Sequence, residues 1–544
     1  MKGLLFVVLC CIGSAQVAAD VTAQIPTTLD LAASLQHPLE GRSLPDEDSL
    51  VRSIYLSTGT LLWSKQGEFT PQARELLALV HSADDLGLRA LDYGDAQLDA
   101  ARDSAVQPAK RADYTQFDVW LTESAARLIS HLHYGRIDPR TVEFELPDSR
   151  HDLDVPTAVI NLAASASVAH SVSQAEPHFY HYALLKGALA RYRELAADLS
   201  LTNLAPIGSK TLHRGEPYAG TQALRKLLAA EGDLAAAAAV DVRSENSIDA
   251  GMSDALKRYQ SRHGLAVTGD LDRATWGALN TPLAARVRQI ELTLERWRWI
   301  PAFSSPPIIV NIPQFELFAF STTTDRAASI LQIPVIVGQT YPGKRTPVFL
   351  GELKRVVFRP YWDIPRSITV HEVLPGLRRH PDYLERNHME LVRGEGDDGE
   401  IIAPSDEAIA QLAAGRLRVR QQPGDDNALG LVKFLFPNAH NVYMHSTPAH
   451  QLFLAPRRTF SHGCIRVADP VALASYVLKN AASPWDTSRI EAAMHGTSTL
   501  RIDLIEPIHV MILYGTVMAT EAGPVQFFDD IYGHDRQLAA LLGI

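Results

Sequence analysis

The residue best suited to chemistry in this chain is Cys464, which lies in the run Ser461-His462-Gly463-Cys464-Ile465-Arg466. A thiol paired with a histidine base can attack a carbonyl and form a covalent acyl intermediate. His445 lies 19 residues upstream and is a candidate base. Gly463 carries no side chain, so the backbone beside the thiol can approach a ligand closely. The pattern therefore predicts nucleophilic acyl chemistry rather than a buried, inert thiol.

Two histidines are close enough in sequence to serve as that base. His462 lies two residues before Cys464 and would share a strand face with it. His445 follows the apolar run 441–444 and is expected to emerge at the end of a strand. Either imidazole could take the thiol proton and later protonate a leaving amine. The strand-end position favours His445.

The charge that develops on an attacked carbonyl oxygen needs hydrogen-bond donors. The backbone N–H groups of Gly463 and Cys464 are the expected donors. The Tyr443 hydroxyl is a candidate third donor because it shares a strand face with His445. Arg466 either binds a carboxylate of the substrate or braces the loop through backbone carbonyls, and the sequence favours neither role.

The first 19 residues have the features of a secretory signal. Lys2 supplies a positive start, residues 3–13 form a short apolar run, and Val17-Ala18-Ala19 is a small-residue cleavage site. The apolar run is short for a bilayer span, and we find no other run of about 18 apolar residues. We therefore expect an exported protein of the periplasm, with an uncleaved inner-membrane anchor as the alternative.

Cysteine use and charge narrow the functional class. Cys10 and Cys11 lie within the expected signal, so the exported chain would offer Cys464 no disulfide partner. The formal net charge of -11 and the lack of a basic patch argue against nucleic acid as a ligand. The length of 544 residues and the 46% hydrophobic content predict several domains with packed cores.

Residues 28–240 are rich in Ala and Leu and are interpreted as a helical scaffold domain. Apolar residues recur at helical spacing in 70–84, 114–133 and 179–199, with Gly and Pro between these segments. The composition of this part offers no chemistry. A further helix is expected at 284–300, where two tryptophans are interpreted as packing anchors.

Residues 246–281 form a compact helical unit in which Ser253 and Asp272 are expected as helix caps. The runs 259–265, 268–269 and 275–280 resemble the small three-helix peptidoglycan-binding module. The resemblance covers about 35 residues and implies a cell-wall ligand. A relic module that serves only in packing is the alternative.

After Pro307 the pattern changes to strands, and residues 305–505 are interpreted as a mostly β catalytic domain. The charged, glycine-rich stretch 366–430 interrupts this pattern and is expected to be an insertion that caps the site. Residues 506–544 are expected to form a tail that packs on the scaffold or on the catalytic domain. Strands are expected at 308–312, 315–320, 332–337, 351–358, 431–436, 439–444 and 508–517, and a helix at 470–480. The fold class is therefore multidomain α+β.

The run Met444-His445-Ser446-Thr447, followed after a spacer by residues 461–466, resembles the catalytic signature of YkuD-type L,D-transpeptidases. The family pattern commonly has glycine after the first histidine, where this chain has Ser446. The resemblance extends over roughly 305–505. Scaffold, wall-binding module and insertion together are similar to the large Gram-negative, YcbB-like subgroup.

This resemblance implies a specific reaction. Cys464 would attack the carbonyl of the third, diamino acid residue of a peptidoglycan tetrapeptide stem and release D-Ala. A side-chain amine of another stem would take the acyl group, giving a 3→3 cross-link. His445 would be the base, oriented by its Ser446 or Thr447 surroundings. No metal or organic cofactor is expected, and sensitivity to carbapenems is implied. The expected substrate-binding residues are Ser461, His462, Ser446 and Arg466.

Two other functions remain open at this point. A wall carboxypeptidase or cysteine endopeptidase would form the same acyl-enzyme but transfer it to water. A non-catalytic wall-binding protein would keep the 246–281 module without needing Cys464. The expected partners are peptidoglycan stems, with a carboxypeptidase that trims pentapeptides and other wall-synthesis proteins; the sequence does not give the oligomeric state.

Overall fold

The chain folds into two compact units. The structure is a computed structural model, and it describes residues 28–105, 114–147, 152–201, 203–235, 246–322, 331–521 and 524–544. Unit 1 comprises the residues up to Asp84 together with Leu88–His131 and Leu153–Ala175, and unit 2 comprises Asp85–Gly87, Leu132–Asp152 and Glu176–Ile544. The expected scaffold range 28–240 therefore contributes to both units. The expected signal, 1–19, lies outside the described residues.

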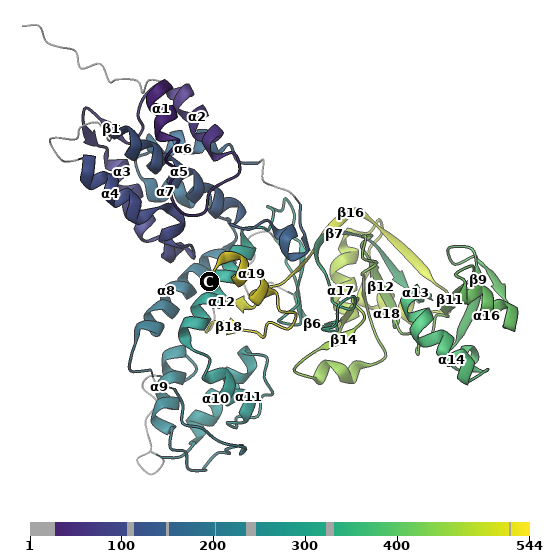
Figure 1. The fold of residues 1–544 in the computed structure, drawn as a ribbon. Helices are drawn as coiled ribbons and strands as arrows, with labels where there is room; N and C mark the ends of the chain where they lie inside the picture. Colours follow the sequence, from purple (N-terminus) through teal and green to yellow (C-terminus); the bar gives the residue numbers. More distant parts are fainter. Residues whose placement is uncertain are drawn as a thin grey trace, which may run out of the picture. The chain divides into compact units, whose positions relative to one another are not determined.

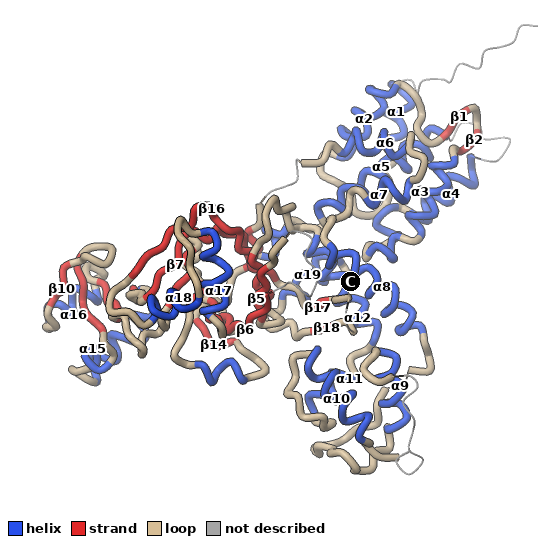
Figure 2. The backbone as a smooth tube through the Cα atoms, turned by 180° about the vertical axis from the view of Figure 1, so that it is seen from behind, coloured by secondary structure: helices blue, strands red, loops and turns tan. Residues whose placement is uncertain are grey.

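Unit 1 is almost entirely helical (Figure 2). Its centre is helix α5, on which the buried Asp118 accepts hydrogen bonds from the backbone N–H groups of Leu62 and Trp63 at 2.8 Å each. The helices expected near 70–84 and 114–133 are present. The elements are α1 Thr28–Ser34, α2 Glu47–Thr58, α3 Pro71–His81, α4 Asp95–Ala105, α5 Tyr114–Tyr134, α6 Val155–Ala163 and α7 Val168–Ser173, with the short hairpin β1 Ser64–Lys65 and β2 Glu68–Phe69.

Unit 2 begins with two long helices that pack on each other. Helices α8 (Tyr180–Ala197) and α12 (Leu283–Trp297) share a core, in which Leu189 and Leu294 are fully buried. Trp297 and Trp299 are also buried, which agrees with their interpretation as packing anchors. Among the described residues, no helix has both the length and the apolar character needed to cross a membrane.

Three helices with their own core form the small module of unit 2: α9 (Thr221–Glu231), α10 (Ala250–Arg262) and α11 (Arg273–Leu279). The first of them precedes the expected range 246–281. Asp272 caps α11 as predicted, since its carboxylate accepts from Thr275 N at 2.7 Å.

The predicted cap of α10 is wrong. Asp249 caps this helix, because its carboxylate accepts from Met252 N at 2.8 Å. Ser253 lies one turn later and its hydroxyl donates to the carbonyl of Gly269. The helix therefore starts earlier than the sequence pattern indicated.

The part of unit 2 that follows Pro307 is built around a closed barrel (Figure 1). The strand order is β12-β13-β15-β6-β5-β4-β16-β7, and β7 pairs with β12 to close the ring. The hairpin expected from 308 to 320 is present. The strands are β4 Ile308–Asn311, β5 Glu316–Ala319, β6 Leu331–Gly338, β7 Val348–Phe358, β12 Val432–Leu435, β13 Met444–His445, β15 Ile465–Val467 and β16 Leu500–Leu513, with β3 Phe144–Glu145 added to β7, β14 Thr459–Ser461 added to β6, and helices α17 Pro470–Val477 and α18 Thr487–Met494.

The strand predicted at 439–444 forms only at its end. Asn438 uses its side chain to organise a turn: Nδ2 donates to the carbonyls of Phe436 and Val442, and Oδ1 accepts from Val442 N at 3.1 Å. Asn441 adopts a left-handed conformation with φ 54°. The chain therefore enters β13 only at Met444, directly before the site.

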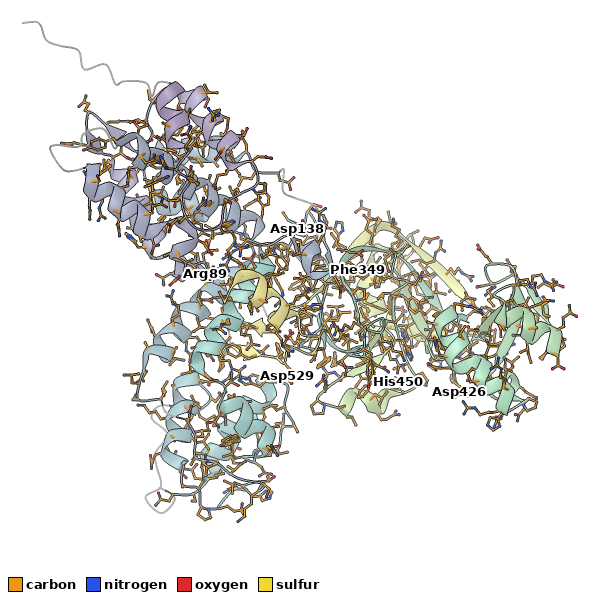
Figure 3. All side chains as sticks on the ribbon, in the orientation of Figure 1. Arg89, Asp138, Phe349, Asp426, His450 and Asp529 are labelled. Atoms are coloured by element: carbon orange, nitrogen blue, oxygen red, sulfur yellow. The ribbon has the colours of Figure 1, made fainter. Side chains whose placement is uncertain are left out.

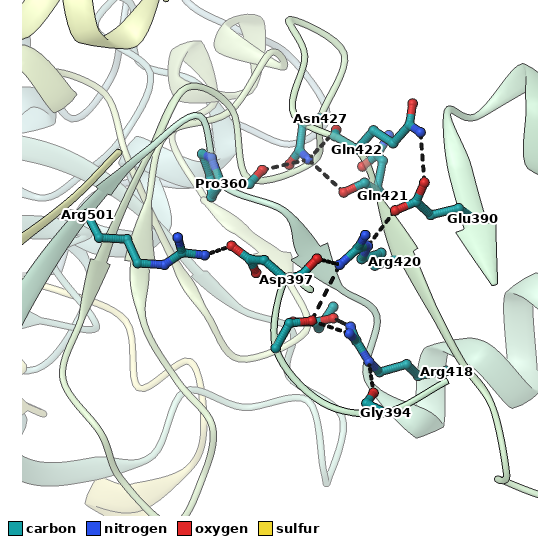
Figure 4. A network of polar contacts seen from close by, with 12 residues as sticks. Pro360, Glu390, Gly394, Asp397, Arg418, Arg420, Gln421, Gln422, Asn427 and Arg501 are labelled. Carbon is teal, nitrogen blue, oxygen red and sulfur yellow. Dashed lines mark hydrogen bonds and ion pairs between the residues drawn. The ribbon is translucent and has the colours of Figure 1, made fainter. Parts of the chain in front are cut away.

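The insertion folds around a separate core, which includes Leu391, Leu412 and Val419. Its sheet has the strand order β10-β9-β11-β8. Figure 4 shows the polar network at its base, where Arg420 bonds Glu390 and Asp397 forms an ion pair with Arg501 of β16. The elements are β8 Trp362–Asp363, α13 Arg366–Ile368, η7 Thr369–Val373, α14 Leu374–Arg379, α15 Tyr383–Arg386, β9 Met389–Arg393, β10 Glu400–Ile402, α16 Asp406–Ala413 and β11 Arg418–Gln421.

The residues after 505, expected as a packing tail, also build the barrel. Strand β16 continues to Leu513 and pairs with both β4 and β7. Helix α19 (His534–Leu542) adds Leu538 and Leu542 to the barrel core. Figure 3 shows the side chains around these elements, with Phe349 of β7 on the barrel and Asp426 near the end of the insertion, after β11.

Candidate active site

Two adjacent strands bring the predicted chemical residues to one face of the sheet. Strands β13 and β15 run parallel, with Met444 opposite Ile465 and His445 opposite Arg466. Met444 and Ile465 are fully buried in the barrel core. Since side chains alternate along a strand, the neighbours on either side of this pair project from the opposite face. The residues gathered on that face are Tyr443, His445, Cys464 and Arg466.

Gly463 and Ser461 shape the loop that presents the thiol. Gly463 has φ +116°, a conformation that residues with a Cβ rarely adopt. Ser461 is buried; its Oγ donates to the carbonyl of Cys464 at 2.5 Å and accepts from Gly463 N at 3.1 Å. Ser461 therefore holds the loop, and its role toward a substrate stays a prediction. The Gly463 N–H, predicted as an oxyanion donor, is occupied by this serine, which leaves the N–H of Cys464 for that role.

A second set of hydrogen bonds, made by Thr346 and Tyr532, fixes the same loop. Thr346 Oγ1 donates to the carbonyl of Gly463 at 2.8 Å and accepts from Gly338 N at 2.8 Å. Tyr532 donates from its hydroxyl to the carbonyl of Gly338 at 2.6 Å and accepts from Thr346 N at 3.2 Å. The loop is thus anchored to β6 and to the residues that follow β16.

Cys464 is a thiol in the resting site. Burial raises its pKa, and the backbone N–H and hydroxyl of Tyr443 oppose this rise by hydrogen bonding to the sulfur. The positive charges of Lys433 and Arg466 lower the pKa further. Burial therefore favours the uncharged thiol, while the hydrogen-bond donors of Tyr443 and the two cations are placed to stabilise a thiolate when it forms.

His445 is neutral in this environment. The residue is 4% exposed, and burial together with the charge of Arg466 lowers its pKa to about 3. Nδ1 lies 2.6 Å from the carbonyl of Ser446. A carbonyl only accepts, so Nδ1 carries the hydrogen and Nε2 is the unprotonated nitrogen of the neutral ring. The ring centroids of His445 and Tyr443 are 5.7 Å apart, and the two rings meet edge to face. His445 can thus act as a base through Nε2.

Lys433 is a site residue that the sequence analysis missed. It lies on β12 directly opposite His445, and its Nζ is 3.8 Å from the centre of the Tyr443 ring. Burial lowers its pKa to about 8, and the Cys464 thiolate opposes that fall. The signal was present in the sequence, as a single lysine within the apolar run 431–436.

Arg466 was predicted either to brace the loop or to bind a carboxylate. Within the described part of the chain its guanidinium makes no hydrogen bond, and its Nε is buried without a partner. Burial lowers its pKa, and the Cys464 thiolate opposes this effect. The bracing role is therefore not seen, and the guanidinium is left for an anionic group.

Ser446 and His462 were predicted as substrate-binding residues, a role that stays a prediction, and the structure gives each side chain a partner within the protein. Ser446 is buried, and its Oγ accepts from Leu431 N at 2.7 Å, so it fixes the chain beside His445. His462 points its Nε2 at Glu372 of the insertion and at Lys344, 3.1 Å from each. This geometry leaves His445 as the candidate base.

The insertion contacts the site at two points. One is the contact between Glu372 and Nε2 of His462 just described. The other is Trp362, at the start of the insertion, which hydrogen-bonds the Tyr443 hydroxyl. Over the residues that the structure describes, no group of three or more His, Cys, Asp or Glu side chains is arranged to hold a metal ion.

Comparison with known proteins assigns three regions of the chain. Residues 306–498 match the L,D-transpeptidase catalytic domain called YkuD, residues 49–189 match a scaffold domain, and residues 218–279 match a "Putative peptidoglycan binding domain". The last match includes α9, in agreement with the three-helix core. The match to YkuD covers both blocks of the predicted signature.

One relative and one solved structure are similar to parts of the chain. A "Putative L,D-transpeptidase" of Haemophilus influenzae is 32% identical over 251 residues, which are 46% of this chain and 49% of the relative. The chain thus matches about half of that protein's length. The crystal structure of an L,D-transpeptidase from Xylanimonas cellulosilytica is 13% identical and aligns with all of that chain and 57% of this one, at a TM-score of 0.17.

Proposed function

Because residues 306–498 are a catalytic domain of the L,D-transpeptidase family, joined to a scaffold and a peptidoglycan-binding domain, we propose that this protein forms 3→3 cross-links in peptidoglycan. The donor is a tetrapeptide stem, and the leaving group is its terminal D-Ala. The observation that carries the proposal is the placement of Cys464 and His445 on one face of adjacent parallel strands. The fixed loop and its N–H donor support the same chemistry.

The reaction begins with transfer of the thiol proton of Cys464 to Nε2 of His445 as sulfur bonds to the carbonyl carbon. The carbonyl oxygen becomes negative and accepts a hydrogen bond from the Cys464 N–H. When the oxyanion collapses, the bond to D-Ala breaks and the new amine takes the proton from His445. The product is a thioester between Cys464 and the donor stem.

Transfer to the acceptor reverses these proton movements. A side-chain amine of a second stem attacks the thioester, and His445 takes a proton from it. The carbon–sulfur bond breaks, and sulfur regains the proton from the imidazole. The unpaired guanidinium of Arg466 binds a carboxylate of the stem beside the thiol, since its planar fork matches that group.

The cellular setting follows from the substrate. Peptidoglycan stems lie outside the cytoplasmic membrane, so the enzyme acts in the periplasm after export by the 1–19 signal. Helices α9–α11 hold polymeric wall, and a carboxypeptidase supplies tetrapeptide stems by trimming longer ones. The proposed reaction needs no metal or organic cofactor.

The test is incubation of the purified protein with a disaccharide-tetrapeptide, followed by mass spectrometry of the products. A dimer lighter by one D-Ala than two substrates is the expected result, and it is absent with Cys464→Ala. Formation of disaccharide-tripeptide without dimer would show that the acyl group goes to water, so that the enzyme is a hydrolase and the proposal is wrong. Dimer formation by the Cys464→Ala protein would remove Cys464 from the mechanism.

A further inference from the structure

A lysine without a counter-ion lies beside the nucleophile. Lys433 belongs to β12, a strand whose neighbouring residues Val432 and Phe434 are fully buried in the barrel core. Within the described residues, no carboxylate forms an ion pair with its ammonium. Withdrawing a charge partly from water is unfavourable unless a nearby group interacts with it. Lys433 is half-buried, so the strand holds a partly desolvated cation beside the nucleophile.

The groups that face Lys433 come from four elements. On β13 and directly before it they are His445, which is neutral, and Tyr443, whose ring lies under the ammonium. On β7 Lys433 pairs with Val357, and the nearby Arg355 is bonded to Asp503. The other charged groups are Arg466 and the thiolate form of Cys464 on the β15 side, and Arg501 of β16, which pairs with Asp397. Of these groups, the Cys464 thiolate is the one that raises the pKa of Lys433.

We propose that Lys433 is a positioning residue whose ammonium, held on the face of Tyr443, stabilises the Cys464 thiolate during attack. This inference rests on the proposed function, because it concerns the same nucleophile. Lys433 acts in two ways: its charge attracts the thiolate directly, and it polarises the Tyr443 phenol, which strengthens the hydroxyl as a donor to sulfur. No new bond or co-reactant is required.

The need for such a cation follows from the state of His445. In many Cys/His pairs the imidazolium itself balances the thiolate charge. Here the imidazole is buried beside the cations Arg466 and Lys433, so the imidazolium is disfavoured. The fixed cations of β12 and β15 take over that balancing role. His445 is left to carry the proton between sulfur and the leaving amine.

Lys433 fits this role better than that of a substrate ligand. Its ammonium sits on an aromatic ring and is only partly exposed, whereas Arg466 offers an unpaired guanidinium beside it. A guanidinium is the better match for a carboxylate. Lysine at position 433 is a point charge, which suits stabilisation of a neighbouring sulfur anion.

The test measures ionisation of the thiol in the absence of peptidoglycan. The full chain is titrated by ultraviolet absorbance of the thiolate, with the Cys464→Ala protein as the blank that subtracts Cys10, Cys11 and the tyrosines. The pH dependence of alkylation by iodoacetamide is a second readout. We expect Lys433→Met to raise the titration midpoint by about one pH unit, which slows alkylation at neutral pH by about tenfold.

Charge rescue and a matched control sharpen this result. Lys433→Arg keeps the charge and should restore most of the ionisation, whereas Lys433→Gln should behave like Lys433→Met and serves if the Met variant does not fold. Lys479 is the matched control, because its ammonium also lies over a tyrosine ring, that of Tyr476, at 6.0 Å. Lys479→Met should leave the midpoint unchanged.

The outcomes separate this inference from the proposed function. An unchanged midpoint in folded Lys433→Met or Lys433→Gln protein overturns the role of Lys433, even if the enzyme still forms dimers. A raised midpoint that Lys433→Arg fails to lower would assign the effect to packing and also overturn it. Dimer formation by Cys464→Ala would instead overturn the proposed function, whatever the titration shows.

Discussion

The buried histidine predicts an unusual pH profile. The pKa of His445 is lowered to about 3 by burial and by the charge of Arg466. An ordinary histidine with a pKa near 6.5 is only about 3% neutral at pH 5, so a rate that needs the neutral base would fall about 25-fold between pH 7 and pH 5. A base with a pKa of about 3 stays neutral over this range. The rate of acylation should therefore change by less than about twofold.

The assay is the second-order rate of Cys464 acylation by a carbapenem, followed by intact-protein mass spectrometry from pH 5 to pH 7. His462 is the control, since it lies two residues from the nucleophile and pairs with Glu372. A decline in rate that disappears in His462→Gln would be due to that residue. A decline of about 25-fold that persists in His462→Gln would refute the assignment of a neutral, buried His445.

The free energy of unfolding, unlike the acylation rate, should depend on pH in this range. The folded pKa of His445 lies below the unfolded value near 6.5, so the unfolded chain binds the extra proton when the pH falls below 6.5. The stability of the folded state is therefore full above pH 6.5 and is lost as the pH falls toward 3. From pH 7 to pH 5 the loss is about 2 kcal/mol. The difference in free energy of unfolding between wild type and His445→Gln should change by that amount. Taking this difference cancels the contributions of the other titrating groups.

Three further changes test other parts of the site. Cys464→Ala should abolish cross-linking and leave no carbapenem adduct, while the thermal unfolding profile stays near that of wild type; an adduct in this variant would place the nucleophile elsewhere. Gly463→Ala should cut turnover by at least about tenfold, because φ +116° is costly for a residue with a Cβ and the loop must move; unchanged kcat would mean that the loop tolerates the strain. Glu372→Gln removes the charge that joins the insertion to His462 and should speed release of bound drug fragments if the insertion acts as a lid; equal retention in both proteins would count against gating.

Much of the site could be predicted because its chemistry is local in sequence. Cys464 and Gly463 lie side by side, and the end of the apolar run before His445 predicted that this histidine lies at a strand end. The barrel strands from 308 to 358 also carried clear alternation or apolar runs. These features depend on neighbouring residues, which is what a pattern in one chain records.

The rest depended on contacts between segments far apart in the sequence. Lys433 became part of the site only through the pairing of β12 with β13, which no local pattern gives. Ser461 and Ser446 were expected at the substrate, but both hydroxyls are satisfied by backbone groups. The short polar side chain of Asp249 competed with Ser253 for the same helix start, and propensity alone does not separate two such caps.

The hydrogen bonds of Thr346 and Tyr532 that support the Gly463 loop make the nucleophile depend on residues far beyond the matched domain. The matched catalytic domain ends at 498, yet the strand that joins β4 to β7 is Leu500–Leu513, and the Thr346–Gly463 contact is supported by Tyr532. A fragment cut at 498 would keep every residue of the motif while the ring of strands stayed open between β4 and β7. A protein can therefore carry the complete motif without a correctly positioned nucleophile. A shortened relative that retains both histidines and the cysteine can still lack activity.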